Sequence, residues 1–247
     1  MISQCLCGVP WVKPCAIQTY AGPEIYSVER AKEGGARQSG TLYGVRLGFD
    51  HIRRYKLYWG LDALWAKGAL KGSSKDHRIK STLTDTNIEA RFGYTFQSKS
   101  WRCASFTPFV GLGYFWENNC FEHPSPLPIH FKNHFSYLPF GFLSQFSLSK
   151  NVSVGVNVKI RFLIESKVEA SHDPEHEDCT QYYDESLQYR FELPLSYFTC
   201  YKKKSLACCF VPFYEYRPYG YRSNYPFDFL ETKFNIYGAT FKFEYLF

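Results

Sequence analysis

The chain closes with GATFKFEYLF, residues 238–247, in which two kinds of side chain alternate. Apolar and aromatic side chains, including Phe241, Phe243, Tyr245 and Phe247, occupy the odd positions, and polar or small ones occupy most even positions. A period of two places the two kinds on opposite faces of a β-strand. Ten residues are also enough for a tilted strand to cross the hydrocarbon core of a bilayer. The stretch therefore predicts a terminal strand that spans a membrane.

The same alternation recurs along the chain. It is clear in 43–50, 88–96, 152–162 and 187–197. It is weaker in 18–29, 56–67, 106–117, 137–148 and 210–217. With the last segment, these patterns predict about ten strands, and eight or twelve remain alternatives.

The composition excludes a helical membrane protein. The 247 residues include 23 Phe, 20 Tyr and 5 Trp, yet the mean hydropathy is -0.33. No apolar run approaches the roughly 20 residues that a spanning helix needs. A chain of this length fits one domain, which we predict over 17–247.

The segment 1–16 is expected to be a signal remnant or a periplasmic extension. It lacks a basic start, and Pro10, Lys13 and Pro14 interrupt it, so it does not match a complete signal peptide. This mismatch is the one feature that favours the alternative of a soluble β-protein.

Short and long connections between the predicted strands alternate along the chain. The short ones lie at 51–54, 97–102, 149–151 and 202–205. The long, polar ones lie at 31–39, 71–82, 118–133, 164–184 and 218–231. Spanning barrels have this asymmetry, with long extracellular loops and short periplasmic turns. The pattern predicts an all-β fold, a closed antiparallel up-and-down transmembrane β-barrel with both termini on the periplasmic side.

One face of these strands is expected to meet lipid, because an outer face in hydrocarbon must be apolar. The predicted lipid-facing residues are Val45, Leu47, Phe92, Val154, Val156, Val158, Ile160, Leu193, Leu195 and Ala239. Aromatic residues near strand ends are predicted to form the interfacial girdles. They are Tyr43, Trp59, Trp65, Tyr94, Trp116, Tyr197, Tyr237 and Tyr245.

The other face carries charges that we predict to line the lumen. They are Arg46, Asp62, Glu89, Arg91, Lys159, Arg161, Arg190, Glu192, Lys242 and Glu244, six basic and four acidic residues. The near balance favours ion pairing across a lumen that side chains fill at this strand number. The alternative is a narrow pore in which the basic excess favours anions.

The end of the chain resembles a known signature. Phe243, Tyr245 and Phe247 are similar to the C-terminal motif of bacterial outer-membrane proteins, and 147–155 resembles a periplasmic turn of small OmpA-like or opacity-type barrels. The resemblance implies a bacterial outer-membrane location with outer-membrane lipid around the barrel. It also implies that the barrel-assembly machinery recognises these three residues.

Nine cysteines are unusual for such a barrel. The topology places Cys5, Cys7, Cys15, Cys103, Cys200, Cys208 and Cys209 towards the periplasm, and Cys120 and Cys179 in external loops. Both compartments permit disulfides, and the odd count leaves at least one thiol over. The set resembles the cysteine-rich envelope proteins of chlamydia-like bacteria, with the pairing left open.

No motif for catalysis, metal or cofactor binding emerges. The loop 172–179 and the group Cys120, His123, His130 and His134 contain metal-ligand types, but prolines interrupt both, and we predict no metal. Basic residues are scattered, so no nucleic-acid partner is expected. Asp85, Asp184 and His134 lie near the expected mouth, as acidic and histidine residues do in omptin proteases, but no omptin motif matches.

The favoured function is non-enzymatic. The segment 218–227 is dense in Tyr, Arg and Asn, residue types that make good contacts at low entropic cost. We predict an envelope-structural or surface-interaction role, with host or envelope proteins as partners of the external loops. A narrow pore for small solutes and an omptin-like surface protease are the alternatives.

Overall fold

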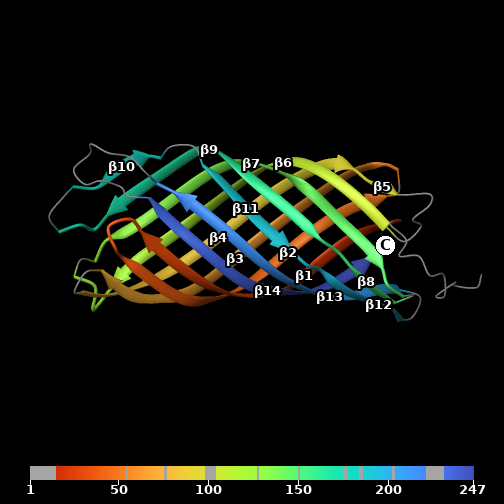
Figure 1. Cartoon of the computed structure of the whole chain (residues 1–247), viewed down its shortest axis with the longest axis horizontal. Helices are drawn as coiled ribbons and strands as arrows, with labels where there is room; N and C mark the ends of the chain where they lie inside the picture. The colour runs from red at the N-terminus through yellow and green to blue at the C-terminus, as the bar shows by residue number, and fades with distance from the viewer. Residues whose placement is uncertain are drawn as a thin grey trace, which may run out of the picture.

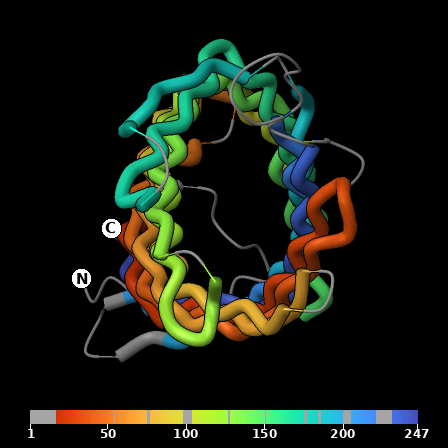
Figure 2. Tube along the Cα trace, turned by 90° about the vertical axis from the view of Figure 1, so that its left-hand side faces the viewer, coloured from red at the N-terminus to blue at the C-terminus, as the bar shows by residue number. Residues whose placement is uncertain are grey.

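The strands form one closed antiparallel sheet. The structure, a computed structural model, describes residues 15–53, 55–74, 77–97, 104–126, 128–149, 151–174, 177–183, 186–201, 204–220 and 231–247. Figure 1 shows the strands running obliquely along one elongated barrel, and Figure 2 shows the wall closing into an oval ring. Within the described residues there is no helix long and apolar enough to cross a membrane.

The wall contains fourteen strand segments. They are β1 Cys15–Lys32, β2 Arg37–Arg53, β3 Leu57–Ser74, β4 His77–Tyr94, β5 Phe96–Gln97, β6 Ala104–Glu122, β7 His130–Ser147, β8 Val152–Val154, β9 Asn157–Ser171, β10 Cys179–Tyr182, β11 Leu187–Glu192, β12 Leu195–Tyr201, β13 Lys204–Tyr219 and β14 Thr232–Leu246. Some of these segments are parts of one interrupted strand: β5 continues β4, β8 continues into β9, and β10, β11 and β12 follow one another between the same two neighbours. The wall therefore has ten strands, which confirms the predicted barrel.

The first and last strands close the barrel. β1 pairs with β2 on one side and with β14 on the other, from Gln18 opposite Leu246 to Lys32 opposite Thr232. β14 pairs in turn with β13 along its whole length. Because every long strand has two neighbours, the wall exposes no sheet edge to hydrocarbon.

The outward face carries a band of exposed apolar side chains. Val45, Leu47 and Phe92 are 47%, 51% and 60% exposed. The other predicted lipid-facing residues also point outward: Val154, Val156, Val158, Ile160, Leu193, Leu195 and Ala239. On β11 and β12 the band runs from Leu187 to Tyr197, about the length that a tilted strand needs to cross a bilayer.

The strands continue well beyond this band, and there the pattern inverts. On β4, Ile88 and Phe92 point outward and are exposed, while Thr86 and the residues before it present polar side chains outward. In that upper part the apolar residues Ile79 and Leu83 point inward and are buried. The wall above the membrane thus has a polar exterior, and its buried interior combines apolar residues such as Ile79 and Leu83 with polar ones such as Gln38 and Ser81.

The predicted long connections were wrong in extent for this reason. Most of 71–82, 118–133 and 164–184 is strand, because the antiparallel ladder continues where the exterior becomes polar. The longest remaining connections lie at one end of the barrel, called here the loop end. The opposite, turn end holds both chain ends of the barrel, where the Phe247 amide donates to the Ile17 carbonyl at 3.0 Å. By the loop-length rule of spanning barrels, the loop end is extracellular.

Candidate functional site in the lumen and at the mouth

The charged residues predicted for the lumen all point inward. Seven are buried, namely Arg46, Asp62, Glu89, Arg91, Lys159, Arg161 and Arg190, and Glu192, Lys242 and Glu244 are partly buried. Sequence reasoning missed six further buried charges: Glu24, Asp50, Asp85, Glu117, Glu215 and Arg217. We call these sixteen residues the ion layer. The missed signal was available, since Glu24 and Glu215 stand at inward positions of the two strands that alternate most weakly.

The additions reverse the expected charge balance. Arg217 raises the number of basic residues from six to seven, and the five carboxylates raise the acidic residues from four to nine. The basic excess on which anion selectivity of a pore was based is therefore absent from the ion layer.

Arg46 occupies the centre of the lower ion layer. It bonds Glu24 through Nε and Nη2, the latter at 3.0 Å, and its Nη1 donates to Asp62 at 2.5 Å. Tyr20 donates to the second Asp62 oxygen at 2.7 Å, and Thr240 donates to Glu24 at 2.6 Å. These contacts join β1, β2, β3 and β14 through buried, oppositely charged groups.

Glu215 is the centre of the upper ion layer. It accepts hydrogen bonds from Arg161, from Arg190 at 2.9 Å and from Arg217 at 2.5 Å. Arg217 also bonds Asp85 at 2.8 Å and Glu117 at 3.3 Å. Side chains from β4, β6, β9, β11 and β13 are thereby connected across the lumen.

Aromatic side chains pack at the upper end of the ion layer. Phe115 stacks on Phe135 with ring centroids 4.4 Å apart, and Phe135 contacts Tyr219 at 5.0 Å. Tyr219 stacks on Phe234 at 5.4 Å, so the rings connect β6 and β7 with β13 and β14 on the opposite side. All four are buried with surrounding leucines. We call Phe115, Phe135, Tyr219 and Phe234 the aromatic layer.

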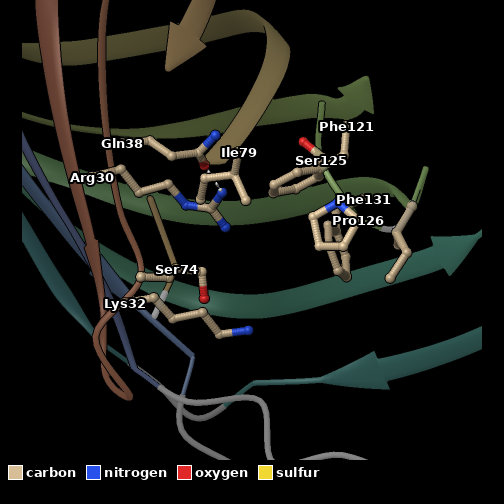
Figure 3. A pocket seen from close by; sticks show the side chains of 11 residues that line it. Arg30, Lys32, Gln38, Ser74, Ile79, Phe121, Ser125, Pro126 and Phe131 are labelled. Carbon is tan, nitrogen blue, oxygen red and sulfur yellow. Dashed lines mark hydrogen bonds between the residues drawn. The ribbon is translucent and has the colours of Figure 1, made fainter. Parts of the chain in front are cut away.

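A cavity of about 300 Å³ lies at the loop end, above the aromatic layer. Its lining is Arg30, Lys32, Ala36, Gln38, Ser74, Ile79, Phe121, Ser125, Pro126, Ile129 and Phe131. Figure 3 shows Arg30 and Lys32 reaching in from β1, opposite the apolar side chains of Phe121, Phe131 and Pro126. We call this space the mouth cavity. Burial, with a smaller effect of Arg30, lowers the pKa of Lys32 to about 8.

Of the residues considered for protease or metal chemistry, His130 and His172 contact each other, with ring centroids 4.3 Å apart, whereas Asp85 and His134 lie apart. Asp85 is buried inside the barrel on Arg217, whereas His134 lies on the outer face, where its ring bonds Tyr114 at 2.8 Å. Asp184 lies outside the described residues. Among the residues that are described, no three metal-ligating side chains cluster.

Two cysteines depart from the expected positions, whereas Cys15 on β1, Cys200 on β12 and Cys208 and Cys209 on β13 lie towards the turn end, on the predicted side. Cys120 and Cys179 lie on β6 and β10 rather than in loops. They are free thiols, as are Cys208 and Cys209 on β13. The expected disulfides are not formed among these four, and Cys5, Cys7 and Cys103 fall outside the described residues.

The assembly-signal residues lie at the turn end of the wall. Phe243 and Phe247 point outward and are each 65% exposed, and the rings of Tyr245 and Phe247 contact edge to face at 4.4 Å. Recognition of these residues by assembly machinery stays a prediction. Most of 218–227, the Tyr-rich segment, lies outside the described residues.

Comparisons with known proteins identify the fold. No protein-family model and no curated protein matches the chain. The outer-membrane protease OmpT of Escherichia coli shares 11% identity at a TM-score of 0.58, with 94% of this chain and 96% of that chain covered. The translocator domain of the autotransporter NalP of Neisseria meningitidis shares 7% identity at a TM-score of 0.51, with 94% and 88% covered.

At such identities the likeness shows the fold alone. The chain has the fold of bacterial outer-membrane β-barrels. Together with the apolar outer band and the closed wall, this fold makes the protein an integral protein of the bacterial outer membrane, as predicted.

Proposed function

We propose that this protein is a sealed barrel that acts through its extracellular end, as a surface-interaction protein rather than a channel or an enzyme. The observation that carries the proposal is the continuous filling of the lumen. The ion layer links opposite walls through buried pairs, and the aromatic layer covers it.

The filling opposes conduction for an energetic reason. A water path would have to break the hydrogen bonds of these buried ion pairs, and each hydrogen bond to a charged group contributes about 1.5–3 kcal/mol relative to water. The path would also have to part the stacked rings of Phe135 and Tyr219, whose centroids are 5.0 Å apart. Barrels of this strand number have room for packed side chains rather than for an aqueous channel.

The extracellular end is suited to binding. The strands carry the wall above the apolar band as a rigid, polar-surfaced rim, and the mouth cavity opens within it. Sites on strands are held more precisely than sites on loops. An envelope-structural role through cysteine bonds has less support, because the four described thiols are free.

Planar-bilayer recording tests the sealed barrel. Purified protein, with insertion verified by the heat-dependent shift of its gel mobility, is expected to give no discrete conductance steps. A double variant, Phe135→Ala with Tyr219→Ala, serves as the comparison, because it removes two rings of the aromatic layer. Reproducible steps from the unaltered protein would remove the proposal and favour the narrow pore.

A hydrolysis assay on unfolded and surface-exposed peptides tests the enzymatic alternative. We expect no cleavage above the background of a mock purification. Cleavage that is lost on replacing His134 or Asp85 would establish the surface-protease alternative in place of the binding role.

A further inference from the structure

We propose that the mouth cavity binds a small carboxylic acid with a short aliphatic or aromatic body. The inference rests on the proposed surface-interaction function and names its ligand class. It combines three features of the cavity, namely its apolar wall, its preformed shape and the sign of its charge.

The apolar wall comes from three strands and one connection. Ile79 of β4 is buried, and Phe121 of β6 and Phe131 of β7 face it together with Pro126 and Ile129. The volume of about 300 Å³ is at the lower limit of small-molecule pockets. It corresponds to about ten water molecules in the liquid, so a ligand of roughly ten non-hydrogen atoms would fill it.

The wall is held in place without a ligand. Ser125 fastens the connection after β6 onto β4, because its Oγ accepts from the Lys80 amide at 2.8 Å and donates to the Lys80 carbonyl at 2.7 Å. The Ser125 amide donates to the Glu122 carbonyl at 2.8 Å, and the Phe121 amide donates to the Ile129 carbonyl at 3.0 Å. A preformed cavity reduces the ordering cost of binding.

The charged side chains among the described lining residues are basic. They are Arg30 and Lys32, and no described residue that lines the cavity or the small neighbouring space beside Tyr183 and Tyr219 is a carboxylate. A cation would meet two like charges there. An anion would meet two partners in a half-buried setting, where charge-assisted hydrogen bonds are strong.

Arg30 is positioned to receive a carboxylate. Its Nη1 donates to the Gln38 Oε1 at 2.9 Å, and its guanidinium lies near the rings of Phe121 and Phe234, at 6.0 and 5.7 Å from their centroids. Its Nε is buried without a hydrogen-bond partner in the described structure. A buried donor without an acceptor is unfavourable, and a carboxylate oxygen would relieve that cost through the fork geometry of arginine.

Binding of 4-fluorobenzoate, which has about the ten non-hydrogen atoms that fit the cavity, is followed by fluorine NMR on the full chain in lipid nanodiscs and tests the inference. The neutral amide of the same shape is the matched probe. We expect the acid to bind at least about tenfold more tightly than the amide, since a charge-assisted bond exceeds a neutral one.

Two variants separate the charge from the shape. Arg30→Gln is expected to weaken binding of the acid by about tenfold or more while leaving the affinity for the amide nearly unchanged. Ile79→Phe fills the cavity and is expected to abolish binding of both probes with Arg30 intact. Arg37→Gln is the matched control, because Arg37 is exposed at the start of β2 and does not line the cavity.

Equal affinity for acid and amide, or full acid binding by either cavity variant with normal heat-modifiable folding, would overturn the inference. Absence of any acid binding by the unaltered protein would overturn it as well. The proposed function fails separately, through conductance steps, so a silent barrel that binds no probe removes only the ligand assignment.

Discussion

Glu215→Gln is expected to lower the free energy of unfolding by about 3–5 kcal/mol. Glu215 is fully buried and accepts from three arginines, and each hydrogen bond to a charged group contributes about 1.5–3 kcal/mol. In this variant Arg217 retains its ion pairs with Asp85 and Glu117, and Arg190 retains its ion pair with Glu192 at 2.7 Å. Most of the lost stabilisation therefore comes from Arg161, whose partner is Glu215. Removing one member of a buried pair costs about 3–5 kcal/mol, which sets the expected magnitude.

The assay is reversible urea unfolding in lipid vesicles, followed by tryptophan fluorescence. Glu215→Gln is compared with Arg161→Met and with the double variant, whose loss should fall short of the sum of the single losses by about 2 kcal/mol. Glu122→Gln is the control, because the Glu122–Lys80 pair is exposed on the outer face and its loss should leave the midpoint unchanged. A loss below about 1 kcal/mol for Glu215→Gln, or additive losses, would refute the view that Glu215 holds the upper ion layer together.

Three further outcomes are expected. Deleting Phe247 should reduce the yield of heat-modifiable, membrane-inserted barrel more than it changes probe binding by the barrel that does insert, and a normal yield would contradict the assembly role. Affinity for the benzoate probe should fall as the pH rises through about 8, where Lys32 loses its charge, and Lys32→Met should remove that step in a titration between pH 6 and 10. Gly22→Ala should impair closure of β1 on β14, because the added Cβ would lie 1.6 Å from the Phe241 carbonyl oxygen; unchanged folding yield would show that the two strands can separate locally.

The membrane-spanning part of the barrel was predictable because lipid imposes a simple rule. Outward positions such as Val45 and Phe92 must be apolar, and inward positions such as Arg46 are free to be charged, so the alternation is visible in the sequence. Above the membrane the outward side chains become polar, and apolar side chains can point inward. Leu83 is buried on the same inward face of β4 as Glu89 lower on the strand. The sequence analysis required apolar residues to stay on one face along a whole strand. It therefore placed the end of each strand where the apolar residues change face.

The site was less predictable for a different reason. Residues of the ion layer occupy every second position of a strand. Glu24 and Glu215 could therefore have been predicted from the two segments in which the alternation is weak. The mouth cavity follows from packing, since it brings Arg30 next to Phe121 and Phe131, which lie about a hundred residues further along the chain. No local spacing connects these residues, and only the closed wall places them together.

Because the strands extend beyond the apolar band, they hold the mouth cavity above the membrane. Ile25 is the last large exposed apolar residue on the outward face of β1, and Lys32 follows seven residues later. At about 3.3 Å per residue and a tilt of roughly 40°, that stretch rises about 18 Å above the hydrocarbon. The cavity therefore stands clear of the acyl chains and collects its ligand from the surrounding medium, so capture depends on the concentration dissolved outside the cell rather than on the composition of the bilayer.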